Sequence, residues 1–290
     1  MNWELAKSWL LVAFLLLDLF LGWQVYESRR EFLGYVASVS DQLANTKTIL
    51  SEHGFILATA VPSEHPDMPL IRADFAAVPL EDLGRLAFPP SSSWQVDAQA
   101  GTLHADQGEI RTLGQGQWQV RFTAPIPWPN QGLAGLPGVW QPGQYQEDTG
   151  LAVAAGLSKD GRATGTRVFV QTANGFPVFD AAVSVALVNG RVTGFTQTAL
   201  VNVAAAGDAK PTISAMDALD SLAGAVDKSA GGADNKILSV TLGYVHKVPK
   251  TASGVQGAPA QGYWFPVWRV VTPNHLYDIN ALTGEVDTES

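Results

Sequence analysis

The chain has 290 residues, of which 46% are hydrophobic and 16% charged, so a largely disordered chain is not expected and a sizeable core can form. The formal net charge of −9 leaves no basic stripe to neutralise phosphates, which argues against nucleic acid as a partner. The sequence has no cysteine, which excludes disulfides, thiolate catalysis and cysteine-ligated metal.

The segment from Trp9 to Tyr26 is apolar apart from one acidic residue, Asp18. As a helix it would span roughly 27 Å, close to the ~30 Å hydrocarbon core of a bilayer. A carboxylate at the centre of such a helix costs about 2.5–3.5 kcal/mol, which the surrounding leucine, phenylalanine and valine side chains offset. The pattern therefore predicts a transmembrane anchor over residues 1–30.

A cleaved signal peptide is the alternative for this segment. Its apolar region is longer than signal peptides usually have, it contains Asp18, and no small-residue cleavage site directly follows it. An uncleaved, single-pass anchor in the cell membrane is the favoured interpretation. Basic residues flank the segment on both sides, so charge alone leaves the orientation open. A large acidic region after the anchor favours a cytoplasmic N-terminus and extracytoplasmic C-terminal domains.

Asp18 is the first candidate for function, because ionisable residues inside membranes usually face a partner or a cavity. The alternative is that it lies shallow and protonated. Gly22 follows one turn later and would let a neighbouring helix approach closely. Together with Asp18, the residues on the same face of the helix define the predicted partner-binding surface. They are Leu11, Phe14, Leu15, Gly22 and Val25.

Residues 31–54 show helical spacing of apolar residues that ends at Gly54, and they predict a juxtamembrane helix. Its apolar face is expected to pack on the first soluble domain, with a coiled coil as the alternative. Short strands broken by turns follow, at 55–57, 70–75, 94–98, 102–105 and 117–123. They open a first extracytoplasmic domain over 55–205.

Residues 125–150 are rich in Pro, Gly, Gln and Trp and predict a long loop or lid. Trp128 and Trp140 lie within it. If exposed, they could anchor a protein partner, and packing in the core is the alternative.

The strands 167–171 and 178–188 alternate strongly, with hairpin turns predicted at Asn174-Gly175 and Asn189-Gly190. Residues 191–203 continue the sheet, and 204–210 read as a linker. In the last segment, residues 206–290, Ser214 is predicted to cap a helix, with Asp217 at its third position. Strands at 238–244, 263–271 and 275–279 complete an α+β unit with an antiparallel sheet over one helix.

No catalytic, cofactor or metal site is predicted. The five histidines are scattered, and the sequence has no metalloprotease, nucleophile-elbow or phosphate-loop motif. His104, Asp106 and Glu109 are close together, but a polar hairpin turn accounts for them.

The segments Phe265-Pro-Val-Trp-Arg-Val-Val271 and Leu276-Tyr-Asp-Ile-Asn-Ala-Leu-Thr-Gly-Glu-Val286 resemble the closing strands of a PepSY-type domain. The stretch from Val168 to Val183 is similar to a hairpin in propeptide-like domains of exported peptidases. These resemblances imply two tandem α+β domains with antiparallel sheets, each packed on a helix.

The N-terminus carries a second resemblance. The stretches Met1-Asn-Trp-Glu-Leu-Ala-Lys7 and Phe14-Leu-Leu-Leu-Asp-Leu-Phe-Leu21, with Gln24, resemble the start of the YycI (WalI) family. Asn2 stands where that family usually has Asp. The resemblance implies a single-pass protein that associates with a YycH-like protein and a WalK-like sensor histidine kinase through membrane helices.

The expected function is therefore non-enzymatic regulation of a sensor histidine kinase in cell-wall homeostasis, with no small-molecule substrate. A tethered PepSY-type module that binds or restrains an exported peptidase is the alternative.

Overall fold

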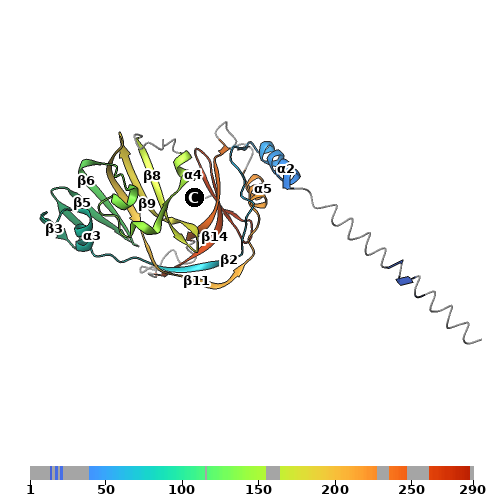
Figure 1. Ribbon diagram of the computed structural model, residues 1–290, viewed down its shortest axis with the longest axis horizontal. Helices are drawn as coiled ribbons and strands as arrows, with labels where there is room; N and C mark the ends of the chain where they lie inside the picture. Colours follow the sequence, from blue (N-terminus) through green and yellow to red (C-terminus); the bar gives the residue numbers. More distant parts are fainter. Residues whose placement is uncertain are drawn as a thin grey trace, which may run out of the picture. The chain divides into compact units, whose positions relative to one another are not determined.

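The computed structural model describes residues 14, 17–18, 20–21, 39–114, 116–154, 164–226, 235–246 and 261–287. The chain divides into two compact units, residues 1–48 and 49–290. The helix α2 (Val39–Glu52) begins in the first unit and ends in the second. The fold is α+β, as predicted, with a mostly antiparallel sheet and few helices (Figure 1).

One large sheet dominates the second unit. Within the described residues, fourteen strands belong to it, and ten of them follow the order β11-β2-β14-β13-β9-β10-β6-β5-β4-β3. The strands on this path are β2 (Met68–Phe75), β3 (Trp94–Asp97), β4 (Thr102–Ala105), β5 (Gly108–Gly114), β6 (Gln117–Pro127), β9 (Phe176–Val188), β10 (Arg191–Thr198), β11 (Leu200–Lys210), β13 (Ser239–His246) and β14 (Gln261–Val271).

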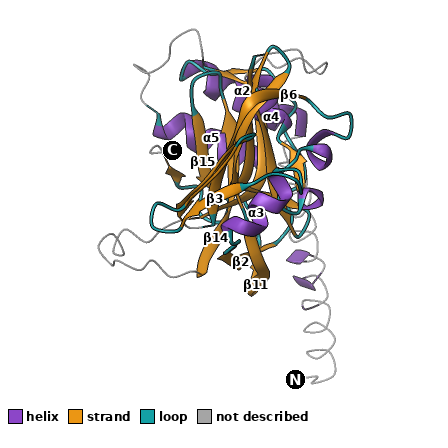
Figure 2. Cartoon of the chain, turned by 90° about the vertical axis from the view of Figure 1, so that its left-hand side faces the viewer, coloured by secondary structure: helices purple, strands orange, loops and turns teal. Residues whose placement is uncertain are grey.

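The remaining elements lie off this path. They are β1 (Ile56–Leu57), β7 (Tyr145–Glu147), β8 (Gly165–Ala173), β12 (Lys236–Ile237), β15 (Leu276–Asn280), β16 (Val286–Asp287), the helices α3 (Leu80–Ala87), α4 (Thr149–Ala154) and α5 (Ala215–Ala225), and two 3-10 turns at Gly132–Gly135 and Pro142–Gln144. Strands β1 and β12 form a small parallel sheet of their own. In Figure 2 the unit is viewed from the β3 end, with α3 beside β3.

The two predicted hairpin turns are confirmed. Asn174 and Gly175 have φ of 52° and 83° between β8 and β9, and Asn189 and Gly190 have φ of 51° and 73° between β9 and β10. Positive φ at both central residues is the condition for a type I′ turn, whose twist matches that of the flanking strands. The Asn174-Gly175 turn fixes the adjoining register, so that Gln171 lies opposite Val178, and a β-bulge then shifts it, so that Val170 lies opposite Ala182.

The helix predicted after Ser214 is also confirmed. The Ser214 hydroxyl accepts a hydrogen bond from the Asp217 backbone N–H at 3.1 Å, and the Asp217 carboxylate accepts one from the Ser214 N–H at 3.3 Å. This capping box begins α5, whose apolar face buries Leu219 and Leu222 completely. The strands β13, β14 and β15 follow it in the predicted order.

Two hydrophobic clusters form the core of the second unit. The first cluster joins residues 50–73 with α5, β13, β14 and β15. The second cluster lies among α3, β4, β5, β6, β8, β9 and β10. Strand β9 contributes Val178 and Ala181 to the first cluster and Val183 and Val185 to the second. Because one strand runs through both, the two clusters share a continuous sheet. The domain limits at 54 and 205 stay a prediction.

Several local predictions differ from the structure. Residues 204–210, expected to be a linker, are the end of β11 and pair with β2. The small residues there have little intrinsic strand preference, and pairing with the apolar strand β2 outweighs it. The helix α3 and the strand β5 were not predicted. The 125–150 segment contains the end of β6, both 3-10 turns and β7, and it buries Leu133, Leu136 and Val139.

Candidate partner-binding surfaces

The N-terminal residues that the structure describes form part of a helix. Phe14, Leu17, Phe20 and Leu21 are exposed by 57%, 49%, 60% and 47%, and Asp18 lies among them, also exposed. Phe14 and Leu21 lie four residues before and three residues after Asp18, on its own side of a helix. The other members of the predicted surface, Leu11, Leu15, Gly22 and Val25, lie outside the described residues. In the part of the chain that the structure describes, no helix is both long enough and apolar enough to span a bilayer.

Trp128 is half-buried in a stack of side chains beside β8. Its ring lies nearly parallel to Phe169, with centroids 6.0 Å apart and an interplanar angle of 13°. The Arg167 guanidinium lies 4.6 Å above the Trp128 ring and donates two hydrogen bonds of 2.8 Å to the Glu147 carboxylate. Glu147 and Trp128 both belong to the 125–150 segment, so this stack fastens that segment to β8.

Trp140 is held by its backbone. The Gln197 amide, on β10, accepts a hydrogen bond from the Trp140 N–H at 3.0 Å and donates one to its carbonyl at 2.8 Å. The Gln197 amide also donates to the Tyr145 hydroxyl at 3.0 Å, which in turn donates to the Thr198 carbonyl at 3.1 Å. Desolvation by burial raises the pKa of Tyr145 to about 12, and the hydrogen bond from Gln197 opposes the rise.

A second glutamine repeats this arrangement. The Gln171 side chain, 3% exposed on β8, accepts from the Leu200 N–H at 3.0 Å and donates to the Leu200 carbonyl at 2.9 Å. It also donates to the Gln144 side chain at 2.9 Å. An amide side chain that pairs with both the N–H and the carbonyl of one residue replaces a strand partner. In this way Gln171 on β8 holds Leu200, and Gln197 on β10 holds Trp140, although neither backbone pairs with that strand. The binding role predicted for Trp128 and Trp140 stays a prediction, on a segment that these side chains and the β7–β8 ladder fasten to the sheet.

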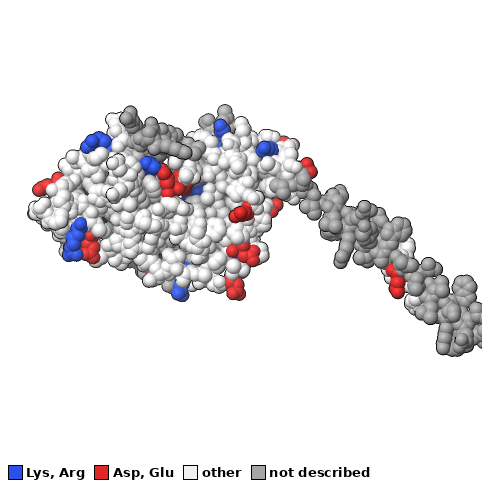
Figure 3. All heavy atoms as spheres, in the orientation of Figure 1, with Lys and Arg blue, Asp and Glu red and all other residues white. Residues whose placement is uncertain are grey.

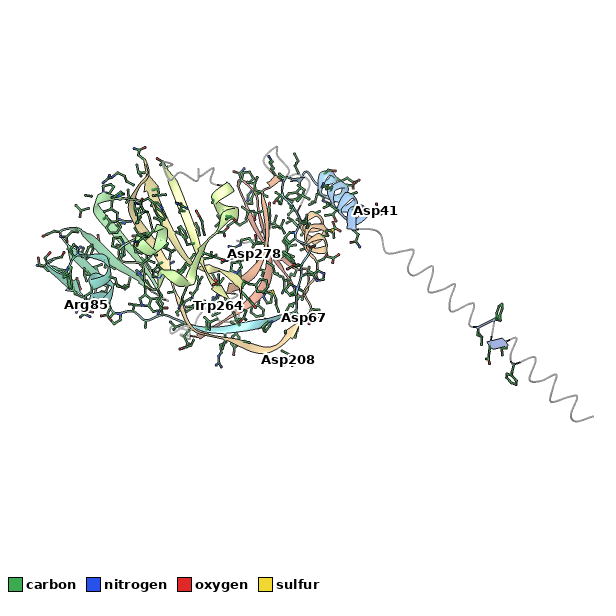
Figure 4. The ribbon with its side chains drawn as sticks, in the orientation of Figure 1. Asp41, Asp67, Arg85, Asp208, Trp264 and Asp278 are labelled. Atoms are coloured by element: carbon green, nitrogen blue, oxygen red, sulfur yellow. The ribbon has the colours of Figure 1, made fainter. Side chains whose placement is uncertain are left out.

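A buried ion pair crosses β14 and β15. Arg269 donates two hydrogen bonds of 2.8 Å to the Asp278 carboxylate, and the two side chains are 11% and 5% exposed. The guanidinium also lies 4.0 Å from the centre of the Phe179 ring. Figure 4 shows Asp278 on the same part of the sheet as Trp264, away from Arg85 on α3. Neither residue was predicted to have a functional role.

Asp180 joins three strands. Its carboxylate accepts hydrogen bonds from the Trp264 indole N–H at 2.8 Å and from the His246 backbone N–H at 2.7 Å. The His246 ring packs against Trp264, with centroids 4.8 Å apart. Desolvation of the carboxylate raises the pKa of Asp180 above its ordinary value, and both hydrogen bonds oppose the rise. The residue as a whole still keeps exposed surface, so its carboxylate is only partly withdrawn from water.

The other polar residues considered from the sequence take structural positions. His104 and Glu109 lie directly opposite each other on β4 and β5, and Asp106 lies in the turn between them. His65 contacts the Thr212 carbonyl at 3.1 Å. On the face shown in Figure 3, charged side chains are scattered singly or in small groups among uncharged atoms.

These features define an α+β protein in which the buried side chains of Gln171, Gln197, Arg269 and Asp278 pair with one another or with the backbone and fix the fold. The model of the YycI protein family matches residues 155–282, and this match confirms the YycI-family assignment for that part of the chain. The matched part includes β8 to β15, whereas the N-terminal residues that resemble the family lie outside it. YycI proteins are a regulatory family.

No curated protein matches the chain. Among the solved structures that match is the crystal structure of an uncharacterized protein from Eubacterium rectale ATCC 33656. It is 10% identical, the alignment covers 81% of this chain and 90% of that chain, and the TM-score is 0.40. At that TM-score the likeness carries no conclusion about this protein.

Proposed function

We propose that the protein is a non-enzymatic, membrane-anchored regulator of a sensor histidine kinase in two-component signalling. The match of residues 155–282 to the model of the YycI protein family is the observation that supports the proposal. The buried polar groups support it, because Arg269 holds Asp278 across two strands and Gln197 holds the Trp140 backbone against β10.

The proposed working surface is the N-terminal helix around Asp18. There a carboxylate lies among exposed phenylalanine and leucine side chains. In a bilayer such a group gains from a polar partner on a neighbouring helix. The partners we propose are membrane helices of a WalK-like kinase and of a YycH-like protein. The N-terminus would lie in the cytoplasm, and residues 49–290 would lie on the extracytoplasmic side of the membrane.

Co-purification of the full-length chain with the kinase from membranes tests this surface. Asp18→Leu removes the carboxylate and should lower the recovered kinase, while membrane flotation shows unchanged insertion. Leu17→Ala changes the neighbouring residue and serves as the matched control. Equal kinase recovery with wild type and Asp18→Leu would rule out the helix contact. Protease digestion of right-side-out vesicles tests the orientation, since residues 49–290 should be accessible.

A second function has a specific observation in its favour. The order of α5, β13, β14 and β15 is the one implied by the resemblance to PepSY-type domains. In that case the protein would bind or restrain an exported peptidase. Full-length protein in nanodiscs should then slow cleavage of casein by the peptidases secreted by the host cell. Unchanged cleavage at saturating protein would dismiss this alternative.

A further inference from the structure

A hollow of about 400 Å³ lies on one face of the large sheet, over β6, β10 and β9. Its size falls in the range of roughly 300–1,000 Å³ that is usual for ligand pockets. We call it the β10 hollow, because β10 lies between the other two strands. We define it by six of its lining residues, which are Gln119, Arg121, Ser184, Ala186, Gly194 and Thr196.

The β10 hollow lies on the polar face of these strands. Phe195 of β10 lies opposite Val120 of β6, and both are buried in the second hydrophobic cluster. The next residue of β10, Thr196, lies opposite Gln119 on one side and Ser184 on the other. Successive side chains of a strand point to opposite faces of the sheet. The three polar side chains therefore share the face that points away from the second cluster, and all three are half-buried.

The depth of the hollow comes from the neighbouring row of residues. Gly194 lies in the middle of this row, opposite Arg121 on β6 and Ala186 on β9. The glycine has no side chain and the alanine has only a methyl group, so the row is low beside the long arginine. A Cβ added at Gly194 would lie 2.4 Å from the Val120 carbonyl oxygen, so this close approach of β6 requires glycine. The backbone of two strands therefore shapes the hollow.

The polar groups that line the hollow keep hydrogen-bonding capacity. Among the described residues, the side chains of Gln119, Ser184 and Thr196 form no hydrogen bond with the protein. The Thr193 hydroxyl donates to the Ala186 carbonyl at 3.3 Å, and its own lone pairs can still accept. Hydroxyl and amide side chains both donate and accept. A ligand hydroxyl, which also does both, is the group that such a lining can satisfy.

Arg121 gives the hollow its sign of charge. It is the one charged residue among the described residues that line the hollow, and its side chain forms no ion pair in the part of the chain that the structure describes. Glu109 lies opposite Arg121 on β5, and Arg111 lies opposite Gln119. These three charged residues leave an excess of one positive charge on this face, whereas the whole chain carries −9. An anionic group on a ligand would be attracted to Arg121.

The lining favours a carboxylate over a phosphate. A guanidinium group matches the two oxygens of a carboxylate with two parallel hydrogen bonds. A phosphate gains most from the N–H groups of a helix N-terminus or of a backbone nest, and the described lining residues all lie on strands.

We propose that the β10 hollow binds a hydroxylated carboxylate of the sugar-acid class. Arg121 binds the carboxylate, and Gln119, Ser184 and Thr196 bind the hydroxyl groups. The proposal is independent of the role of the Asp18 helix.

Calorimetric titration of the full-length protein in phosphatidylcholine nanodiscs tests the proposal, with empty nanodiscs as the blank. The probes are glucuronate, glucose and acetate at the same ionic strength. Glucose lacks the carboxylate and acetate lacks the hydroxyl groups. Glucuronate should bind saturably and about tenfold or more tightly than either, since each of the others loses hydrogen bonds that the hollow offers. Absence of saturable glucuronate binding, or equal affinity for glucose or acetate, would overturn the proposal.

Three variants locate the binding, with circular dichroism as the check on folding. Arg121→Gln should weaken glucuronate binding about tenfold, because it removes the charged partner of the carboxylate. Arg111→Gln is the matched control, because Arg111 lies on the adjacent strand but does not line the hollow, and it should change the affinity less than about twofold. Thr196→Val keeps the approximate shape and removes one hydroxyl, so it should weaken binding roughly fivefold.

Two outcomes of these variants would contradict the hollow. Equal losses for Arg121→Gln and Arg111→Gln would mean that glucuronate responds only to the general charge of the surface. Unchanged affinity in Thr196→Val would mean that the ligand does not reach the centre of the polar row.

Discussion

Arg269 and Asp278 lie directly opposite each other on β14 and β15, and their two parallel hydrogen bonds of 2.8 Å are almost completely buried. In such a place each charge depends on the other, because neither can regain the water it has lost. The pair also holds the guanidinium against Phe179, on β9. It thus connects the C-terminal hairpin to the strand that both hydrophobic clusters share.

We therefore expect Asp278→Leu to lower the free energy of unfolding by about 3–5 kcal/mol, because it leaves Arg269 buried without a counter-charge. The double variant with Arg269→Met and Asp278→Leu should lose much less, since both charges are then gone and the volume is kept. Urea denaturation followed by tryptophan fluorescence measures both. A double variant no more stable than Asp278→Leu alone would show that the charge pair itself contributes the stability.

The register of this pair could have been predicted. The turn at Pro273-Asn274 makes Val271 and Leu276 the closing pair of the hairpin, and counting outward from it brings Arg269 opposite Asp278. Alternation then assigns both side chains to the same face. In the same way, the Asn-Gly turns and the cap at Ser214 were predictable because their signals lie within a few residues.

Other features depend on contacts distant in sequence. Gln171 and Gln197 are unremarkable strand residues in the sequence, and their role becomes visible only once the backbones of Leu200 and Trp140 lie beside them. The strand character of residues 204–210 likewise comes from β2, more than 120 residues earlier. The bulge in β6, where residues 122–125 face only Thr193, requires the exact register of β6 on β10, which no local pattern contains.

The Gln197 clamp leads to a second prediction. Gln197→Leu keeps the approximate volume but leaves the Trp140 N–H and carbonyl without their partner, so the variant should lose about 1–3 kcal/mol. The loss should be concentrated in the 132–147 segment, where backbone amides should exchange with deuterium faster than in wild type. Gln95→Leu, at an exposed position on β3, is the control and should leave exchange unchanged. Equal exchange in wild type and Gln197→Leu would mean that other contacts hold the segment.

Tyr145 predicts a dependence on alkaline pH. Its pKa is raised from 10.0 to about 12 in the folded protein, so between these values the unfolded chain loses a proton that the folded chain keeps. The contribution of Tyr145 to the free energy of unfolding is fully present below pH 10. It falls as the pH rises toward 12, by at most ~2.7 kcal/mol. Tyr145→Phe should flatten this fall. Ultraviolet absorbance of phenolate should show one late-titrating tyrosine fewer in the variant, and an unchanged titration would assign the late step elsewhere.

Gly194 on β10 lies at the start of a bulge in β6, and it gives a prediction with an internal control. A Cβ added at Gly194 would lie 2.4 Å from the Val120 carbonyl oxygen, whereas one added at Gly143 would meet no atom within 4 Å. Because the obstruction at Gly194 is backbone, it cannot move aside without shifting β6. Gly194→Ala should therefore lower the free energy of unfolding by about 1–3 kcal/mol, as overpacking does, while Gly143→Ala should be neutral or slightly stabilising. Thermal unfolding followed by circular dichroism compares the two. Similar midpoints for both would show that β6 and β10 can separate at the bulge without cost.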